Sequence, residues 1–261
     1  MSRRFFGKTD MKKRIIHFLD VLLWPVIALI VILSFVEDVG LDQHLYFEEQ
    51  LKAGVVETAG ISEDDLWKLD TRLFMCLQGE DDWNEEWDLQ DGGEPLNVVV
   101  NGVQQIAFNE REVQHLLDCQ RLFHLLSVTQ IALMIAIVVL VIFSKILPRI
   151  WKIKSELTPK HLWIGSAVII APFAFLAIWA AIDFSSAFNF FHRILFTNDL
   201  WLLNPETDLL IRICPQSMFA NMGLRIALLS AAVLLGLPLV VTVLHLIFKK
   251  RKKDTNEIPQ I

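Results

Sequence analysis

Four long apolar runs constrain the fold of this chain more than any other feature of its sequence. They cover residues 15–36, 123–147, 162–183 and 222–248, and each is close to the ~20 residues that a helix needs to cross a bilayer. The first run has no small-residue cleavage pattern after Ser34, so we interpret it as a retained span and not as a signal peptide. Because charged residues still make up 21% of the chain, we expect a water-exposed part in addition to the four spans.

The distribution of basic residues predicts how the spans are oriented, because lysine and arginine stay on the cytoplasmic side of a membrane. Six lie between residues 3 and 14, five between residues 145 and 160, and five between residues 249 and 253. Both termini are therefore expected in the cytoplasm, where the basic segments contact anionic lipid. The predicted segments are 1–36 (cytoplasmic amino terminus and span one), 37–121 (acidic extracytoplasmic domain), 122–183 (spans two and three with a basic cytoplasmic loop), 184–221 (interfacial extracytoplasmic segment) and 222–261 (span four and basic cytoplasmic tail).

Residues 37–121 carry 21 acidic against 5 basic residues, which argues against nucleic acid as a partner. Within them, Ser62 followed by Asp65 and the helical pattern "DDLWKLDTRLFMCLQ" predicts a capped helix that ends at Gly79. The acidic stretch 80–94 has no apolar periodicity and predicts a surface loop. Asn101 and Gly102, between alternating apolar residues, predict a β-hairpin.

Asn109 followed by Glu112 resembles a capping box and predicts a helix that runs directly into span two. The predicted fold class is an all-α integral membrane protein of four transmembrane helices, with a small extracytoplasmic α+β domain between spans one and two. An interfacial helix is expected between spans three and four. For this helix Asn204 is the predicted cap, Asp208 and Arg212 form an ion pair one turn apart, and Leu209, Leu210 and Ile213 lie at headgroup depth.

Two histidines are candidates for chemistry at the outer membrane boundary. His192 lies in "FHRILFTNDLW", among large apolar side chains, and His115 lies on the helix that enters span two from the same side. Glu112 and Asp118 are each three residues from His115, so either carboxylate is expected within reach of its ring. A histidine among interfacial aromatic residues also has a structural interpretation, because its ring can extend to water.

Two stretches, "FNEREVQHLLDCQRLF" (108–123) and "FHRILFTNDLWLLNPETDLLIRICPQSMF" (191–219), resemble the bacterial lipoprotein intramolecular transacylases. The four-span topology with an outer domain after span one is similar too. The acidic stretch 80–94 departs from the family pattern, and Leu116 stands where methionine is expected.

The resemblance implies a reaction on a diacylglyceryl-modified bacterial lipoprotein in the membrane. The sn-2 acyl chain moves to the α-amine of the terminal cysteine, which leaves a lyso-form N-acyl lipoprotein. It implies His115 and His192 as the catalytic residues, with no cofactor and no metal. Acyl transfer within one molecule needs a base and an oxyanion donor but no enzyme nucleophile, and no G-x-S-x-G motif is present. Which histidine is the base stays open. The candidate supporting or substrate-binding residues are Glu112, Asp118, Arg193, Asn198, Asp199 and Asn204.

Two other interpretations remain at this stage. Cys76, Cys119 and Cys214 all lie on the predicted outer side, which allows one disulfide and suggests a four-span thiol-redox protein, although no C-x-x-C motif is present. A non-enzymatic membrane or metal-binding subunit would use His115 and His192 as ligands, although the sequence offers no coherent ligand spacing. The sequence predicts neither the disulfide pairing nor an oligomeric state.

Overall fold

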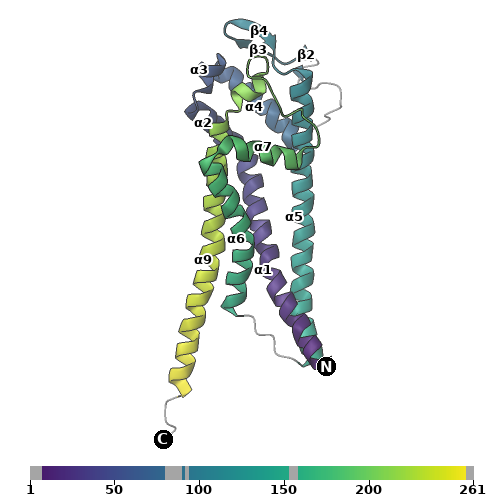
Figure 1. The fold of residues 1–261 in the computed structure, drawn as a ribbon, viewed down its shortest axis with the longest axis vertical. Helices are drawn as coiled ribbons and strands as arrows, with labels where there is room; N and C mark the ends of the chain where they lie inside the picture. Colours follow the sequence, from purple (N-terminus) through teal and green to yellow (C-terminus); the bar gives the residue numbers. More distant parts are fainter. Residues whose placement is uncertain (1–7, 80–89, 92–93, 153–157, 257–261) are drawn as a thin grey trace, which may run out of the picture. The chain divides into compact units, whose positions relative to one another are not determined.

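The computed structural model describes residues 8–79, 90–91, 94–152 and 158–256, and most of them are helical (Figure 1). The helices are α1 (Lys8–Gly40), α2 (Gln43–Lys52), α3 (Val55–Ala59), α4 (Glu63–Gln78), α5 (Glu110–Trp151), α6 (Pro159–Ile182), α7 (Phe184–Leu195), α8 (Leu209–Ile213) and α9 (Gln216–Asn256). The strands are β1 (Gln90–Asp91), β2 (Glu94–Pro95), β3 (Asn97–Val100) and β4 (Val103–Ile106).

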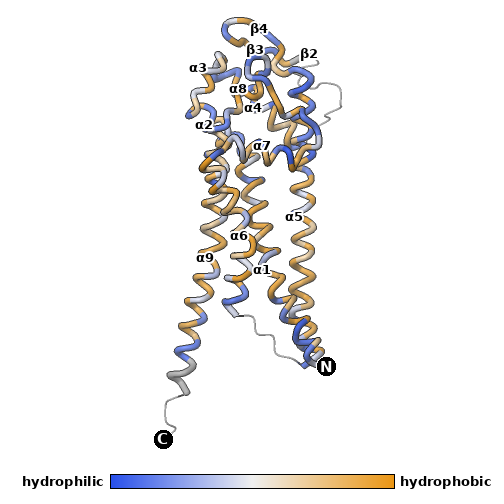
Figure 2. The backbone as a smooth tube through the Cα atoms, viewed as in Figure 1, coloured by the Kyte–Doolittle hydropathy of each residue, from blue (hydrophilic) through white to orange (hydrophobic). Residues whose placement is uncertain are grey.

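Four helices, α1, α5, α6 and α9, are long and apolar enough to cross a membrane. Figure 2 shows the apolar stretches as orange segments along these helices. Between 6% and 17% of the residues in these stretches are buried inside the protein, so most of their apolar side chains need lipid around them. The prediction of four transmembrane helices is confirmed, and the chain is an integral membrane protein.

The chain divides into two compact units. Unit 1 consists of Met1–Ser34, Gln130–Ala174 and Ala227–Ile261, and unit 2 of Phe35–Thr129 and Phe175–Ile226. In unit 1, α6 approaches α1 closely at Gly165. A Cβ added to this glycine would come 2.5 Å from the Cβ of Trp24 on α1. Trp163 Nε1 also donates to Thr242 Oγ1 at 3.0 Å. A small residue at a close crossing and a hydrogen bond between helices are both common ways to join transmembrane helices.

Unit 2 has a hydrophobic core to which α2, α3, α4, α8 and strand β3 contribute. The predicted helix 62–78 is confirmed as α4, since the Asp65 N–H donates to Ser62 Oγ at 3.1 Å and Gly79 ends the helix with φ 68°. Asn101 and Gly102, with φ 51° and 80°, form the predicted turn between β3 and β4. Both local signals were therefore sufficient to locate these elements.

The start of α5 is fixed by the predicted capping box. The Asn109 N–H donates to Glu112 Oε2 at 2.7 Å, and the Glu112 N–H donates to Asn109 Oδ1 at 3.1 Å. The helix then continues for 42 residues without a break, as predicted. Of the predicted loop 80–94, residues 80–89 and 92–93 lie outside the described residues. The remainder differs from the prediction, because β1 pairs with β2 there in antiparallel fashion.

The predicted interfacial helix was placed wrongly in the sequence. The chain forms a turn after Asn204, and α8 begins only at Leu209 with Asp208 as its cap residue. Leu209, Leu210 and Ile213 are buried in the core of unit 2 and do not face lipid. The exposed apolar residues of this region lie instead on α7, where Phe191 is 52% and Ile194 63% exposed.

The predicted ion pair between Asp208 and Arg212 is wrong as well, since no salt bridge joins them in the described part of the chain. The Asp208 carboxylate instead accepts hydrogen bonds from the Asn204 N–H, the Thr207 hydroxyl and the Asn109 amide, at 2.8, 2.8 and 2.9 Å. As a cap residue outside the helix, Asp208 does not share a helical face with Arg212.

A buried polar contact joins α2, α4 and α8 inside the core of unit 2. Gln50 Nε2 donates to Asp70 Oδ1 at 3.0 Å and to the carbonyl of Ile213 at 2.9 Å. Asp70 is fully buried, and burial raises the pKa of its carboxyl to about 7, an effect that the Gln50 hydrogen bond partly opposes. Because this pKa is higher in the folded than in the unfolded chain, the contribution of Asp70 to stability is complete below the unfolded-state pKa of about 4. It is lost as the pH rises from there through the folded-state pKa.

We expect Asp70→Asn to flatten the pH dependence of stability. Because each pKa unit corresponds to about 1.4 kcal/mol, the free energy of unfolding of the wild type should lose about 2 kcal/mol between pH 5 and 7 through Asp70 alone. The neutral amide of the variant does not titrate. The melting temperature of the variant, relative to that of the wild type, should therefore increase as the pH rises. Thermal unfolding in detergent from pH 5 to 8, with Asp64→Asn at an exposed site as the control, measures this, and parallel curves for Asp70→Asn and wild type would contradict it.

Candidate active site

His192 lies in the third turn of α7 and is 7% exposed. Its Nδ1–H donates to the carbonyl of Phe188, one turn earlier, at 2.8 Å. Because a carbonyl can only accept, this hydrogen bond fixes the neutral ring as the Nδ1–H tautomer and leaves the lone pair on Nε2. A ring nitrogen with a free lone pair is the arrangement required of a general base.

His115 lies in the second turn of α5 and is 8% exposed. Its Nε2 is 3.7 Å from Cys119 Sγ, while Nδ1 is buried and has no hydrogen-bond partner among the described residues. The centroids of the His115 and His192 rings are 6.1 Å apart, and the ring planes are inclined by 38°. The structure therefore brings together two histidines that are 77 positions apart in the sequence.

Aromatic side chains enclose the two imidazoles. The ring centroids of Phe188 and Trp201 lie 4.0 and 4.9 Å from that of His192. The ring centroid of Phe196 lies 5.1 Å from that of His115 and 5.5 Å from that of His192. Burial among these apolar groups lowers the pKa of His192, and the hydrogen bond to the Phe188 carbonyl opposes this only in part. His192 is consequently neutral at pH 7.

Neither carboxylate that was expected beside His115 bonds to its ring. Glu112 is 1% exposed, and its carboxylate accepts from the Asn109 N–H and, at 2.6 Å, from the Leu210 N–H at the start of α8. Asp118 accepts from Arg121 Nη1 at 2.9 Å and from Asn198 Nδ2 at 2.8 Å. Glu112 and Asp118 were expected within reach of the His115 ring, but neither bonds to it, because both carboxylates are taken by other donors.

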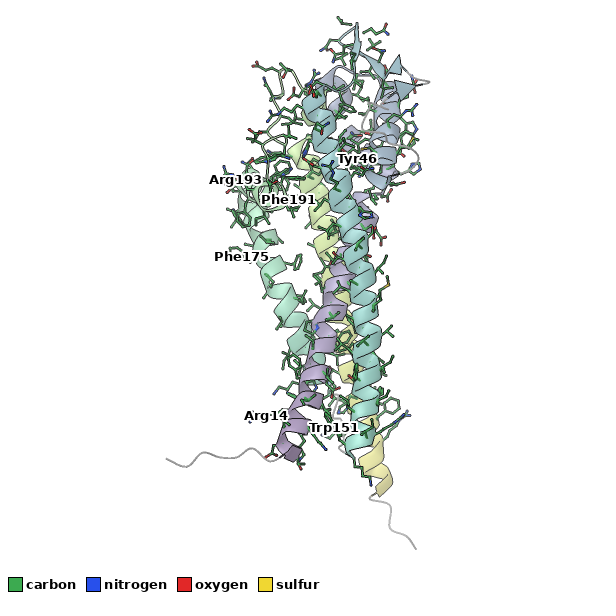
Figure 3. All side chains as sticks on the ribbon, turned by 90° about the vertical axis from the view of Figure 1, so that its right-hand side faces the viewer. Arg14, Tyr46, Trp151, Phe175, Phe191 and Arg193 are labelled. Atoms are coloured by element: carbon green, nitrogen blue, oxygen red, sulfur yellow. The ribbon has the colours of Figure 1, made fainter. Side chains whose placement is uncertain are left out.

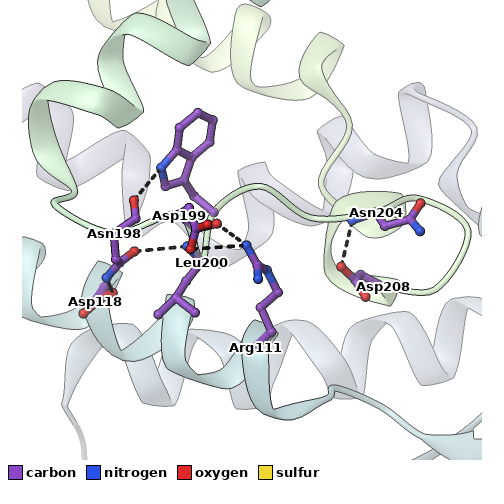
Figure 4. A network of polar contacts seen from close by, with 8 residues as sticks. Arg111, Asp118, Asn198, Asp199, Leu200, Asn204 and Asp208 are labelled. Atoms are coloured by element: carbon purple, nitrogen blue, oxygen red, sulfur yellow. Dashed lines mark hydrogen bonds and ion pairs between the residues drawn. The ribbon is translucent and has the colours of Figure 1, made fainter.

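The remaining predicted supporting residues lie in the segment between α7 and α8 or on α7 itself. Figure 4 shows Asn198 in contact with Asp118, and Asp199 in contact with Arg111, whose guanidinium donates to the Asp199 carbonyl. The Asn204 side chain accepts from the Glu206 N–H at 3.1 Å within its own turn. Arg193 is exposed on α7 (Figure 3) and has no hydrogen bond or ion pair with the described residues.

Sequence reasoning did not identify several groups around the histidines. Arg111, Phe196 and Trp201 were not linked to the site, and neither was Cys119, which is one turn after His115. Phe188 could have been found, since it precedes His192 by four residues on the same helix. Cys119 could have been found in the same way, since it follows His115 by four residues on α5. Arg111, Phe196 and Trp201 come together only through the segment between α7 and α8, for which no local sequence signal exists.

The three cysteines are all free thiols. Burial raises the pKa of Cys76 to about 12 and also raises that of Cys214, whose Sγ lies 2.7 Å from the Tyr46 hydroxyl. Thiol–disulfide exchange needs the thiolate, so these two sulfurs are poorly suited to the thiol-redox interpretation. In the described ranges no group of three or more His, Cys, Asp or Glu is placed to hold a metal ion.

One family model matches most of this chain. The model of the family described as lipoprotein intramolecular transacylase Lit matches residues 12–219. Among curated proteins no match was found.

Solved structures of the membrane integral lipoprotein intramolecular transacylase Lit from Bacillus cereus are similar in fold. One has a TM-score of 0.65 and 20% identity, and the match covers 92% of this chain and 99% of that one. A second, with a histidine-to-alanine substitution, has a TM-score of 0.63 and 20% identity over 93% of this chain and 97% of that one. The predicted fold class is confirmed by this likeness.

Proposed function

This chain belongs to the lipoprotein intramolecular transacylase family, and we propose that it converts diacylglyceryl lipoproteins to the lyso form. In this reaction the α-amine of the terminal cysteine attacks the ester carbonyl of the sn-2 acyl chain. The N–C bond forms, the glyceryl C–O bond breaks, and the proton lost by the amine ends on the freed glyceryl hydroxyl. Donor and acceptor belong to one molecule, so the chain acts as an acyltransferase without forming an acyl-enzyme.

His192 is our assignment for the general base. The bond from its Nδ1–H to the Phe188 carbonyl supports this role, because it leaves Nε2 as the only ring atom that can take a proton. Its lowered pKa supports it further, since the ring stays neutral and able to accept at neutral pH. Once protonated, the same Nε2 can return the proton to the departing glyceryl oxygen.

His115 is our assignment for the oxyanion donor. If the Cys119 thiol donates to Nε2 of His115 across their 3.7 Å separation, the ring proton sits on Nδ1. That nitrogen is buried and without a partner among the described residues, so it is a donor that a tetrahedral oxyanion can occupy. The ring centroids of His115 and His192 are 6.1 Å apart, so both imidazoles can act on one reacting group.

The surroundings of the site suit a lipid substrate. Phe191 and Ile194 flank His192 in the sequence of α7 and are exposed, whereas His192 itself is buried. We propose that this exposed apolar face of α7 contacts the membrane at the extracytoplasmic boundary, with both termini in the cytoplasm beside the basic segments. The substrate then needs no cavity open to water, because it approaches through lipid.

Mass spectrometry of a reporter lipoprotein tests the proposal. The reporter is produced in bacteria that lack such an activity, with and without this chain, and its amino-terminal peptide is isolated. We expect an acyl group on the cysteine nitrogen and a free glyceryl hydroxyl only when the chain is present. A reporter whose acyl groups both remain on the glyceryl oxygens in both samples would refute the function.

The pH dependence of the reaction should reveal the lowered pKa of His192. The substrate amine, with an ordinary pKa of about 7.7–8, makes the rate fall once below that value. Protonation of His192 makes it fall more steeply, and because its folded-state pKa is lowered, this second break should lie below pH 6.5. Initial rates in membranes from pH 4.5 to 8.5 locate the break, and a break at pH 6.5 or above would contradict the assignment.

A further inference from the structure

The segment between α7 and α8 is attached to the first three turns of α5 by side chains of both. Arg111 donates to the carbonyl of Asp199, and Asn109 Nδ2 donates to Asp208 Oδ1 at 2.9 Å. The third attachment is the bond from Asn198 Nδ2 to Asp118 Oδ2 at 2.8 Å (Figure 4). This last bond lies nearest in sequence to the catalytic candidate on α5, because Asp118 follows His115 by three residues.

Asn198 uses all of its polar groups except its own N–H. Its side-chain Nδ2 binds Asp118, its side-chain Oδ1 accepts from the Leu200 N–H at 3.1 Å, and its backbone carbonyl accepts from Trp201 Nε1 at 3.1 Å. Asn198 thereby joins two things directly: the carboxylate on α5 and the indole of Trp201. A shift of Asn198 must move that indole as well.

Trp201 is the largest side chain against His192. It is 9% exposed, and its ring lies 4.9 Å from the imidazole at an inclination of 33°. The other rings around His192 are those of Phe188, Phe191 and Phe196, which are uncharged, and His115 is the one titratable ring in contact with it among the described residues. The indole therefore helps to exclude water from the ring and to set its orientation.

We propose that Asp118 and Asn198 form a positioning pair for the transacylation, which holds Trp201 against His192 and so keeps the base aligned with His115. The inference rests on the proposed function. Neither residue touches the reacting atoms in this scheme; both act through the indole. Since misplacement of a reacting group by about 1 Å can cost a rate factor of roughly 100, loss of the pair should be visible in the rate.

Reversal of the pair tests the proposal. In Asn198→Asp two carboxylates face each other, and we expect the rate to fall roughly 10- to 100-fold. In the double variant Asp118→Asn/Asn198→Asp the amide donates from α5 and the carboxylate accepts, while a carboxylate oxygen at position 198 still accepts from the Leu200 N–H. The rate should then recover to within about threefold of wild type, because the same bond exists with its donor and acceptor exchanged.

Two further measurements separate positioning from a general structural role. In Asn198→Asp the acid break of the pH profile should move up toward 6.5, since the indole no longer keeps water from His192. Arg121→Gln removes the other partner of Asp118 and should leave both the rate and the break unchanged. Asn198→Ala, which lacks the carboxylate repulsion, replaces Asn198→Asp if the latter does not fold, as judged by its melting temperature.

The outcomes distinguish this inference from the function on which it rests. A wild type that forms no N-acyl lipoprotein overturns both. A wild type that forms it, with an Asn198 variant of equal rate and unchanged acid break, overturns only the positioning pair. Failure of the reversed pair to recover, when Asn198→Asp is inactive and the double variant is folded, also overturns it.

Discussion

Replacing His192 with alanine is expected to lower the rate of acyl transfer roughly 10²- to 10⁴-fold, the usual contribution of a positioned general base. In the wild type the bond from Nδ1–H to the Phe188 carbonyl leaves the lone pair on Nε2 of His192. Alanine removes this proton acceptor. The residual rate should no longer show the second acid break, because the group that causes it is gone. Lyso-form product is measured over time in membranes that contain matched amounts of enzyme.

His124 provides a matched control for this experiment. It lies on α5, as His115 does, but it is exposed, and among the described residues no aromatic ring packs against it. His124→Ala should therefore keep the wild-type rate. Full activity of the His192 variant would remove that residue from the mechanism, and equal losses in the His192 and His124 variants would indicate damage to the fold instead.

Replacing Glu112 with alanine should destabilise unit 2 more than any other single change considered above. The carboxylate accepts from the N–H of the exposed residue Asn109 and from the buried N–H of Leu210, at 2.7 and 2.6 Å, and so joins the start of α5 to the start of α8. A buried donor left without a partner costs about 1–3 kcal/mol, and the Leu210 N–H is such a donor, so we expect a loss of about 1–3 kcal/mol in the free energy of unfolding. The melting temperature in detergent and the protease sensitivity of the protein measure this loss.

The neighbouring residue Glu110 serves as the control, because it lies in the same helical turn but is exposed. Glu110→Ala should change stability by less than about 0.5 kcal/mol, as is usual for surface positions. Glu112→Gln keeps one acceptor oxygen and should lie between the two. If Glu112→Ala were as stable as Glu110→Ala, the bond to α8 would have no energetic importance.

The elements that the sequence predicts correctly are those whose signal is local. Ser62 caps α4 within three residues, Asn101 and Gly102 make a two-residue turn, and Asn109 bonds to Glu112 within one turn. The apolar runs are equally local, because span length depends only on consecutive residues. Such contacts are decided by a few neighbouring side chains, so a pattern in the sequence is enough.

The errors arise where a distant segment competes for a polar group. Glu112 was expected beside His115 but bonds to Leu210, 98 positions away, and Asp118 bonds to Asn198, 80 positions away. Asp208 was expected to form an ion pair within a helix but accepts a hydrogen bond from Asn109, 99 positions away in the sequence. The two histidines were chosen from their predicted place at the outer membrane boundary and from the family resemblance, while the rings of Phe196 and Trp201 reach them through a loop whose path no periodicity describes.

The tautomer of His192 is held by a carbonyl of its own helix, four residues back, and not by a group on another element. The ability of Nε2 to accept a proton therefore depends on the last turns of a twelve-residue helix. The terminal turns of a helix unfold locally at a lower free-energy cost than a whole domain unfolds. Warming should accordingly switch off turnover reversibly while the rest of the molecule is still intact, which links the working temperature of the enzyme to the fraying of α7.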